Sequence, residues 1–131
     1  MSLRGIRQLK SLTVQYSDID GSSRGVREWM RKNLVKFAEI NPSAIIKTEK
    51  VRNCHPLLRA FYLNGNKKQI SIKNNSSDDV HEMAMFLRNQ IGRRMGSTGY
   101  SKPVLSNKPS IQGMWNERMD LIDLDVKLVS K

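Results

Sequence analysis

The sequence predicts an α/β domain with one four-stranded mixed sheet, on three observations. Alternating residues over 9–16, an amphipathic stretch over 23–40 and a second alternating segment over 43–52 form a strand–helix–strand unit. An Asn-Gly dipeptide at residues 64–65, the strongest short signal for a tight hairpin, separates two further strand-like segments. A second amphipathic helix begins near Ser76. The predicted order is therefore strand, helix, strand, strand, strand, helix.

The first strand and helix are defined by the spacing of their apolar residues. Leu12, Val14 and Tyr16 share one face of the strand. The helix is expected to end before Asn41-Pro42, because the residue before a proline disfavours helical geometry. A strand–helix–strand unit of this length normally makes a parallel crossover, so the next strand is expected to run parallel to the first. The stripe expected to face the core comprises Val26, Met30, Leu34, Phe37 and Ala38, with Trp29 at its edge.

The hairpin and the last helix are predicted from the same kinds of pattern. The hairpin arms are predicted over residues 57–63 and 67–73, with Ile70 and Ile72 facing the core. Ser76 is a good N-cap, and acidic residues in the next turn favour the positive end of a helix dipole. The buried face of this helix is expected to comprise Val80, Met83, Ala84, Leu87 and Ile91.

The two ends of the chain are distinct from this core. Leu3, Ile6 and Leu9 have helical spacing in an acid-free basic segment, a pattern typical of organelle targeting, but the segment continues directly into the first strand and is expected to be retained. From about residue 95 no period is sustained. We therefore expect a domain over residues 1–94 and an extended C-terminal tail over 95–131, basic and then acidic, with Trp115 as a candidate protein contact.

Charge is the strongest functional signal. The 131 residues contain 23 Lys and Arg against 12 Asp and Glu, a net charge of +11 that predicts a polyanionic partner: nucleic acid first, an anionic membrane surface second. The sequence contains no run of 18 apolar residues, so no membrane span is predicted. With aromatic residues at 6%, little apolar surface remains for a cavity that would hold a small-molecule substrate.

The turn between the first strand and the first helix is a candidate clamp for a phosphate backbone. Ser22 and Ser23 can cap the helix, and Arg24 and Arg27, both expected to be exposed, add charge beside its N-terminus. The alternative is a helix cap with two solvated arginines. Few aromatic residues lie on the strands, which favours recognition of backbone over bases. The candidate RNA-binding residues are Ser22, Ser23, Arg24, Arg27, Arg31, Lys67, Lys68, Arg93, Arg94, Lys102 and Lys108.

Catalytic patterns are absent from the sequence. The element order is the outline of a thioredoxin-like fold, whose enzymes need a reactive cysteine between the first strand and the first helix, but residues 17–23 contain none. Cys54 is the only cysteine; it adjoins His55, and neighbouring strand residues point to opposite faces. A single cysteine excludes an intrachain disulfide and is typical of a reducing compartment. We expect no enzyme, cofactor or metal site.

Four motifs carry a resemblance to a known family. They are Tyr-Ser-Asp at residues 16–18, Gly-Ser-Ser-Arg-Gly at 21–25, Tyr-Leu-Asn-Gly at 62–65, and Pro-Ser-Ile-Gln-Gly-Met-Trp at 109–115. The chain resembles a thioredoxin-like family shared by mitochondrial ribosomal proteins of both subunits and an accessory subunit of respiratory complex I. Residues 9–94 carry the family resemblance, and the segment around Trp115 that of the large-subunit branch.

The resemblance implies a non-catalytic protein of the mitochondrial matrix, packed on large-subunit rRNA and neighbouring ribosomal proteins. Family members often have a cysteine at the position of Ser17, and the family's arginine in the Ser-Arg-Gly turn corresponds to Arg24. Two alternatives remain: a complex I accessory subunit, against which the charge argues, and a redox enzyme, against which the missing cysteine argues.

Overall fold

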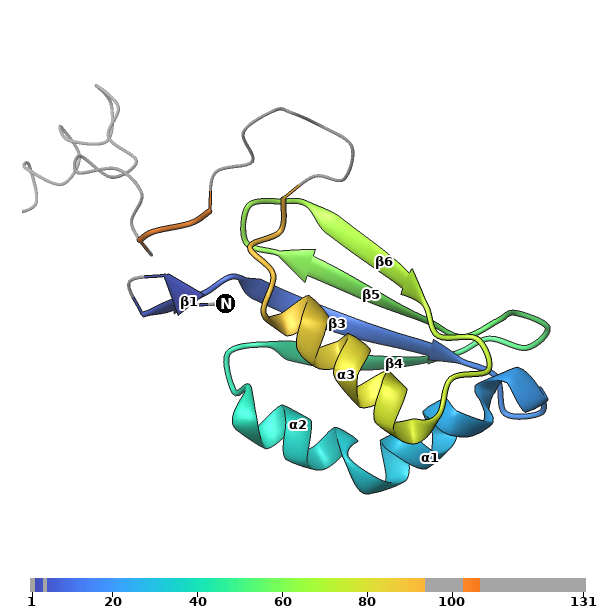
Figure 1. The fold of residues 1–131 in the computed structure, drawn as a ribbon. Coiled ribbons are helices and arrows are strands. Elements are labelled where there is room, and N and C mark those ends of the chain that lie inside the picture. The colour runs from blue at the N-terminus through green and yellow to red at the C-terminus, as the bar shows by residue number, and fades with distance from the viewer. Residues whose placement is uncertain (1, 4, 94–102, 107–131) are drawn as a thin grey trace, which may run out of the picture.

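The computed structural model describes residues 2–3, 5–93 and 103–106, and its centre is a four-stranded mixed sheet of order β4-β3-β5-β6 (Figure 1). β4 runs parallel to β3, and the β3–β5 and β5–β6 pairs are antiparallel, so the predicted α/β class, mixed sheet and parallel crossover are confirmed. The strands are β3 (Leu9–Tyr16), β4 (Ile45–Lys50), β5 (Leu57–Tyr62) and β6 (Lys67–Ser71).

The N-terminal residues form a short antiparallel pair of strands, not the helix that their apolar spacing suggested. β1 (Ser2–Leu3) pairs with β2 (Ile6–Arg7). Gly5, between them, has φ +81°, a conformation that favours glycine because it has no Cβ. A tight turn here overrides the helical spacing.

The long helix predicted over residues 23–40 is divided in two. A 3-10 turn (Gly21–Ser23) leads into α1 (Arg24–Lys32), and α2 (Leu34–Ile40) follows after Asn33. At Asn33 φ is −120°, outside the helical range, although backbone hydrogen bonds still join Asn33 N to Trp29 O and Phe37 N to Asn33 O. The predicted end before Asn41-Pro42 is confirmed.

The last helix, α3 (Ser77–Arg88), begins with the predicted cap. Ser76 Oγ accepts from Asp79 N at 3.2 Å, and Asp79 Oδ2 accepts from Ser76 N at 3.2 Å. This reciprocal arrangement satisfies two backbone donors at the helix start. It also fixes the point where the chain leaves β6 and returns across the sheet.

The core lies between the sheet and the three helices, which all cover the same face (Figure 1). Trp29, expected at the edge of the buried stripe, is fully buried, and its ring packs edge-on against Phe37 at 6.1 Å between centroids. Its indole Nε1 donates to His81 Nδ1 at 3.2 Å, which joins α1 to α3. The buried apolar residues are Leu9, Leu12, Val14, Val26, Trp29, Phe37, Leu58, Ala60, Tyr62, Ile72, Val80, Ala84 and Leu87.

Tyr62 connects β5 to the end of α3. Its hydroxyl donates to Leu87 O at 2.7 Å, and burial raises the pKa of the phenol to about 12. Gly92 has φ +83°, and a Cβ placed on it would lie 2.5 Å from the Tyr62 ring. A glycine is therefore needed where the chain leaves α3 and passes over this ring.

The other face of the sheet carries no helix from the described part of the chain. Strand register places Thr13, Lys47, Arg59 and Phe61 together on it, and we call it the open sheet face. Arg59 lies 3.9 Å from Glu49 and donates to Gln69 Oε1 at 3.4 Å. As expected for adjacent strand residues, Phe61 lies on this face and Tyr62 in the core.

One short piece of the predicted tail returns to the domain. Buried Gln8 donates through Nε2 to Val104 O at 2.7 Å, and its Oε1 accepts from Val104 N at 2.9 Å. The side-chain amide thus pairs with the backbone of Val104 as a neighbouring strand would. Arg94, Lys102, Lys108 and Trp115 lie outside the described residues.

Candidate nucleic-acid interface

The loop over residues 17–23 is held together by two buried serines. Ser17 N donates to Ser23 Oγ at 3.1 Å, and Ser17 Oγ lies 3.4 Å from the backbone nitrogens of Ile19 and Asp20. Ser23 is the N-cap of α1 by position, but its hydroxyl makes no bond to the first helical turn. The expected capping bond is therefore absent, because the nearer Ser17 amide takes this oxygen, and buried Ser23 presents nothing to a partner.

The two arginines that follow this loop, Arg24 and Arg27, differ in exposure. Arg27 is partly buried, and its Nη1 donates to Ser17 O at 2.7 Å and to Asp20 O at 3.0 Å. The expectation that Arg27 is exposed is wrong, because its guanidinium satisfies carbonyls that the turn leaves unpaired. Arg24 and Arg31 are exposed. Arg24, the first residue of α1, is therefore the exposed arginine next to the loop.

Asp18 gathers two cations at the mouth of this loop. Lys50 Nζ lies 2.7 Å and Arg52 Nη2 3.3 Å from Asp18 Oδ2. The hydrogen bond from Lys50, helped by Arg52, lowers the pKa of Asp18 to about 2. Together these three side chains carry a surplus positive charge. Lys50 and Arg52 were not among the predicted site residues, although parallel pairing of β4 with β3 places Lys50 opposite Tyr16.

The hairpin lysines lie at the far end of the sheet. Lys67 pairs with Phe61, whereas the loop over 17–23 follows the other end of β3. Lys67 is exposed, and neighbouring Lys68 is partly buried with its Nζ donating to Gln90 Oε1. Arg93, after α3, is exposed. The described candidates therefore form two groups at opposite ends, not one patch.

Nothing in the described residues assembles a thiol or metal centre. Ser17 occupies the place of a reactive cysteine and is buried. Cys54 is exposed in the β4–β5 loop, so the argument from opposite strand faces does not apply to it, and His55 Nδ1 lies 3.4 Å from Ser22 Oγ. In that part of the chain no three His, Cys, Asp or Glu side chains gather in a way that could hold a metal ion. Nor does any helix there have the length and apolarity to cross a membrane.

Comparison with known proteins shows the family. Residues 26–77 match the family model described as the mitochondrial ribosomal protein L51 / S25 / CI-B8 domain. Large ribosomal subunit protein mL43 of Neurospora crassa is 34% identical over 111 residues, which are 85% of this chain and 79% of that protein. The chain belongs to the mL43 family.

Further mL43 proteins extend the match beyond one relative. The protein from Eremothecium gossypii is 36% identical over 82% of this chain and 75% of its own length. That from Mus musculus is 30% identical over 86% of this chain and 60% of its own length. The family model matches from the third residue of α1 to the first residue of α3. The similarity to mL43 proteins, in contrast, covers most of the chain.

Proposed function

We propose that this chain is a non-catalytic structural protein of the mitochondrial large ribosomal subunit, located in the matrix. Its partners would be the backbone of the large-subunit rRNA and neighbouring ribosomal proteins. The observation that carries this proposal is similarity over most of the chain to proteins named large ribosomal subunit protein mL43. The net charge of +11 supports a polyanionic partner independently.

The exposed cations around the loop over residues 17–23 are the best candidates for RNA contact in the described chain. They are Arg24 at the start of α1, and Lys50 and Arg52, which both contact Asp18. Arg27 would act indirectly, since it holds the loop in shape. The remaining proposed contacts are Ser22, Arg31, Lys67, Lys68, Arg93, Arg94, Lys102 and Lys108 for RNA, and Trp115 for protein.

We also propose that the fold is thioredoxin-like, with a domain over residues 1–94 and a tail over 95–131. The parallel β3–β4 crossover, the β5–β6 hairpin and the following α3 have the expected order. The contact between Gln8 and Val104 supports a tail that is attached near its start. Limited proteolysis tests the division: a protected fragment ending close to residue 94 is expected, and first cuts inside α1 or α3 would contradict it.

The two alternatives have weaker support. The name of the matching family model includes CI-B8, yet the relatives that span most of the chain are ribosomal by name. A module embedded only in protein would also not need so large an excess of cations. A thiol enzyme would need a reactive group where buried Ser17 stands.

Sedimentation of mitochondrial lysate distinguishes the ribosomal proposal from the complex I alternative. A tagged copy of the full chain is expected to migrate with the large ribosomal subunit and to be released from it by nuclease. Migration with a detergent-extracted membrane complex that nuclease leaves unchanged would overturn the proposal. Catalytic thiol turnover that Cys54→Ser abolishes would contradict the non-catalytic role.

A further inference from the structure

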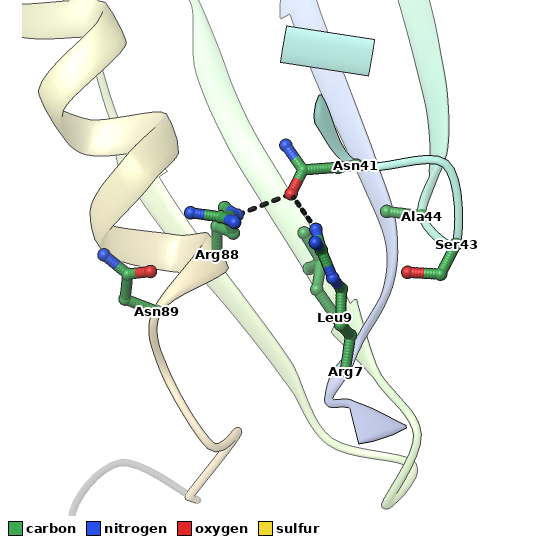
Figure 2. A pocket seen from close by; sticks show the side chains of 7 residues that line it. All are labelled: Arg7, Leu9, Asn41, Ser43, Ala44, Arg88 and Asn89. Carbon is green, nitrogen blue, oxygen red and sulfur yellow. Dashed lines mark hydrogen bonds between the residues drawn. The ribbon is translucent and has the colours of Figure 1, made fainter. Parts of the chain in front are cut away.

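A second basic site lies where β2, the end of α2 and the end of α3 meet (Figure 2). It is a cavity of about 150 Å³, well above the roughly 15 Å³ that one water requires. Arg7 and Arg88 both line it, and among the described residues no acidic side chain does. The other polar groups of its described lining are Asn41, Ser43 and Asn89.

The two arginines converge on a single oxygen. Arg7 Nη1 donates to Asn41 Oδ1 at 2.8 Å, and Arg88 Nε donates to the same atom (Figure 2). The Asn41 side chain is almost fully buried, and its Nδ2 donates to Phe37 O at 2.8 Å, which fixes which end of the amide faces the arginines. A neutral amide oxygen thus orients two permanent positive charges.

Arg7 is held in place but retains donors for a ligand. Its Nη1 also donates to Ile40 O at 3.0 Å, at the carbonyl end of α2, where a helix dipole favours a cation. Within the described part of the chain Arg7 donates through Nη1 only, so Nε and Nη2 remain available. Ser43, next to the cavity, is exposed and adds a hydroxyl.

We propose that this cavity, which we call the Arg7–Arg88 pocket, binds a phosphate group of the RNA backbone. A guanidinium matches the oxygens of a phosphate, and two preorganised guanidiniums concentrate positive charge on one partly enclosed space. The assignment of this phosphate to RNA, and not to a free ion, rests on the function proposed above. The pocket lies at the opposite end of β3 from the loop over residues 17–23, so one RNA could be held at two separated points.

The test uses the full chain, labelled for NMR, with inorganic phosphate in one titration and a short single-stranded RNA in another. Both probes are expected to shift the Arg7 Nε–H and Asn41 side-chain amide signals. Arg7→Gln is expected to lower RNA affinity and to reduce the slope of log affinity against log salt by about 1, the value for one lost phosphate contact.

Two variants distinguish binding in the pocket from a general effect of positive charge and from loss of folding. Lys36→Gln removes one exposed positive charge from α2 outside the pocket, and RNA is still expected to shift the pocket signals in it. Ser43→Asp keeps both arginines and places a carboxylate beside them, so RNA affinity is expected to fall while the melting temperature is maintained.

Each outcome decides the inference. Pocket signals that neither probe moves would overturn it, as would equal losses of salt slope in Arg7→Gln and Lys36→Gln. A response to inorganic phosphate alone would make this a small-anion site and refute the RNA assignment. If RNA shifts the pocket signals but the chain does not sediment with the ribosomal particle, the proposed function fails and the pocket inference stands.

Discussion

Ser17, Ser23 and Arg27 form a closed set of polar contacts inside the loop that precedes α1. Their donors and acceptors satisfy one another and the loop backbone at 2.7 to 3.4 Å. The sequence made Ser23 and Arg27 candidates for contact with a partner, because serine and arginine beside a helix start are typical of anion sites. Their residue types could be recognised from the sequence, but which of them turn inward depends on tertiary packing.

Arg27→Gln and Arg24→Gln are expected to separate these roles. Arg27→Gln removes the donor shared by two carbonyls and is expected to lower the free energy of unfolding by about 1 to 3 kcal/mol. Arg24→Gln, at an exposed position, is expected to change it by less than about 0.5 kcal/mol and to weaken RNA binding. Urea unfolding measures the first effect, and equal destabilisation by both variants would contradict the assignment.

Asp18 is expected to make stability depend on pH in the acid range. Its pKa is about 2 in the folded chain, below its ordinary value of 3.8. The folded state therefore gains stability from the ionised carboxylate above pH 3.8 and loses this gain as pH falls towards about 2. Melting temperatures of wild type and Asp18→Asn should converge across that interval. In a Lys50→Gln background the difference should shrink at higher pH too, and an unchanged difference would exclude the Lys50 contact as the cause.

Elements with strong local signals were predictable, and those set by packing were not. β3 has the predicted bounds of residues 9–16, the Asn-Gly turn joins β5 to β6, and the cap of α3 forms as expected. The break at Asn33 and the central position of Trp29 escaped prediction. The helical spacing of apolar residues continues through both positions. The break and the burial depend instead on how α1 and α2 pack on the sheet.

The start of α1 is expected to tolerate no side chain at Gly25. A Cβ there would lie 1.9 Å from Asn75 O, in the backbone segment that leads into α3. Gly25→Ala should therefore force the two helix starts apart and cost about 1 to 3 kcal/mol of unfolding free energy. Gly21→Ala, whose Cβ would meet nothing within 4 Å, is the matched control and should be neutral or slightly stabilising. Similar melting temperatures for the two variants would refute the close contact.

At the scale of the whole molecule, the charge excess was predictable but its arrangement was not. Lys67 and Arg24 both count toward the same net charge, yet the fold places them at opposite ends of the sheet. The pairing of Arg7 with Arg88 through Asn41 joins residues more than 30 positions apart. Composition predicts a polyanionic partner without indicating where several cations meet.

RNA binding by the full chain is expected to depend strongly on salt. If six to ten phosphates are contacted, affinity should fall by about three to five orders of magnitude between roughly 50 and 200 mM salt, because bound counterions are released from RNA. Filter binding over a salt series measures this slope. A slope near zero would mean that the cations of this chain do not meet phosphates.

The two edge strands of the sheet affect how readily a newly synthesised copy aggregates before it reaches any larger particle. β4 carries Lys47 and Lys50, and β6 carries Lys67, on the two edges that the sheet has in the described part of the chain. Positive charge in these places repels a second identical molecule, which discourages the edge-to-edge association that leads to fibres. A basic composition therefore has two effects: it attracts a polyanion, and it opposes self-association of unassembled molecules.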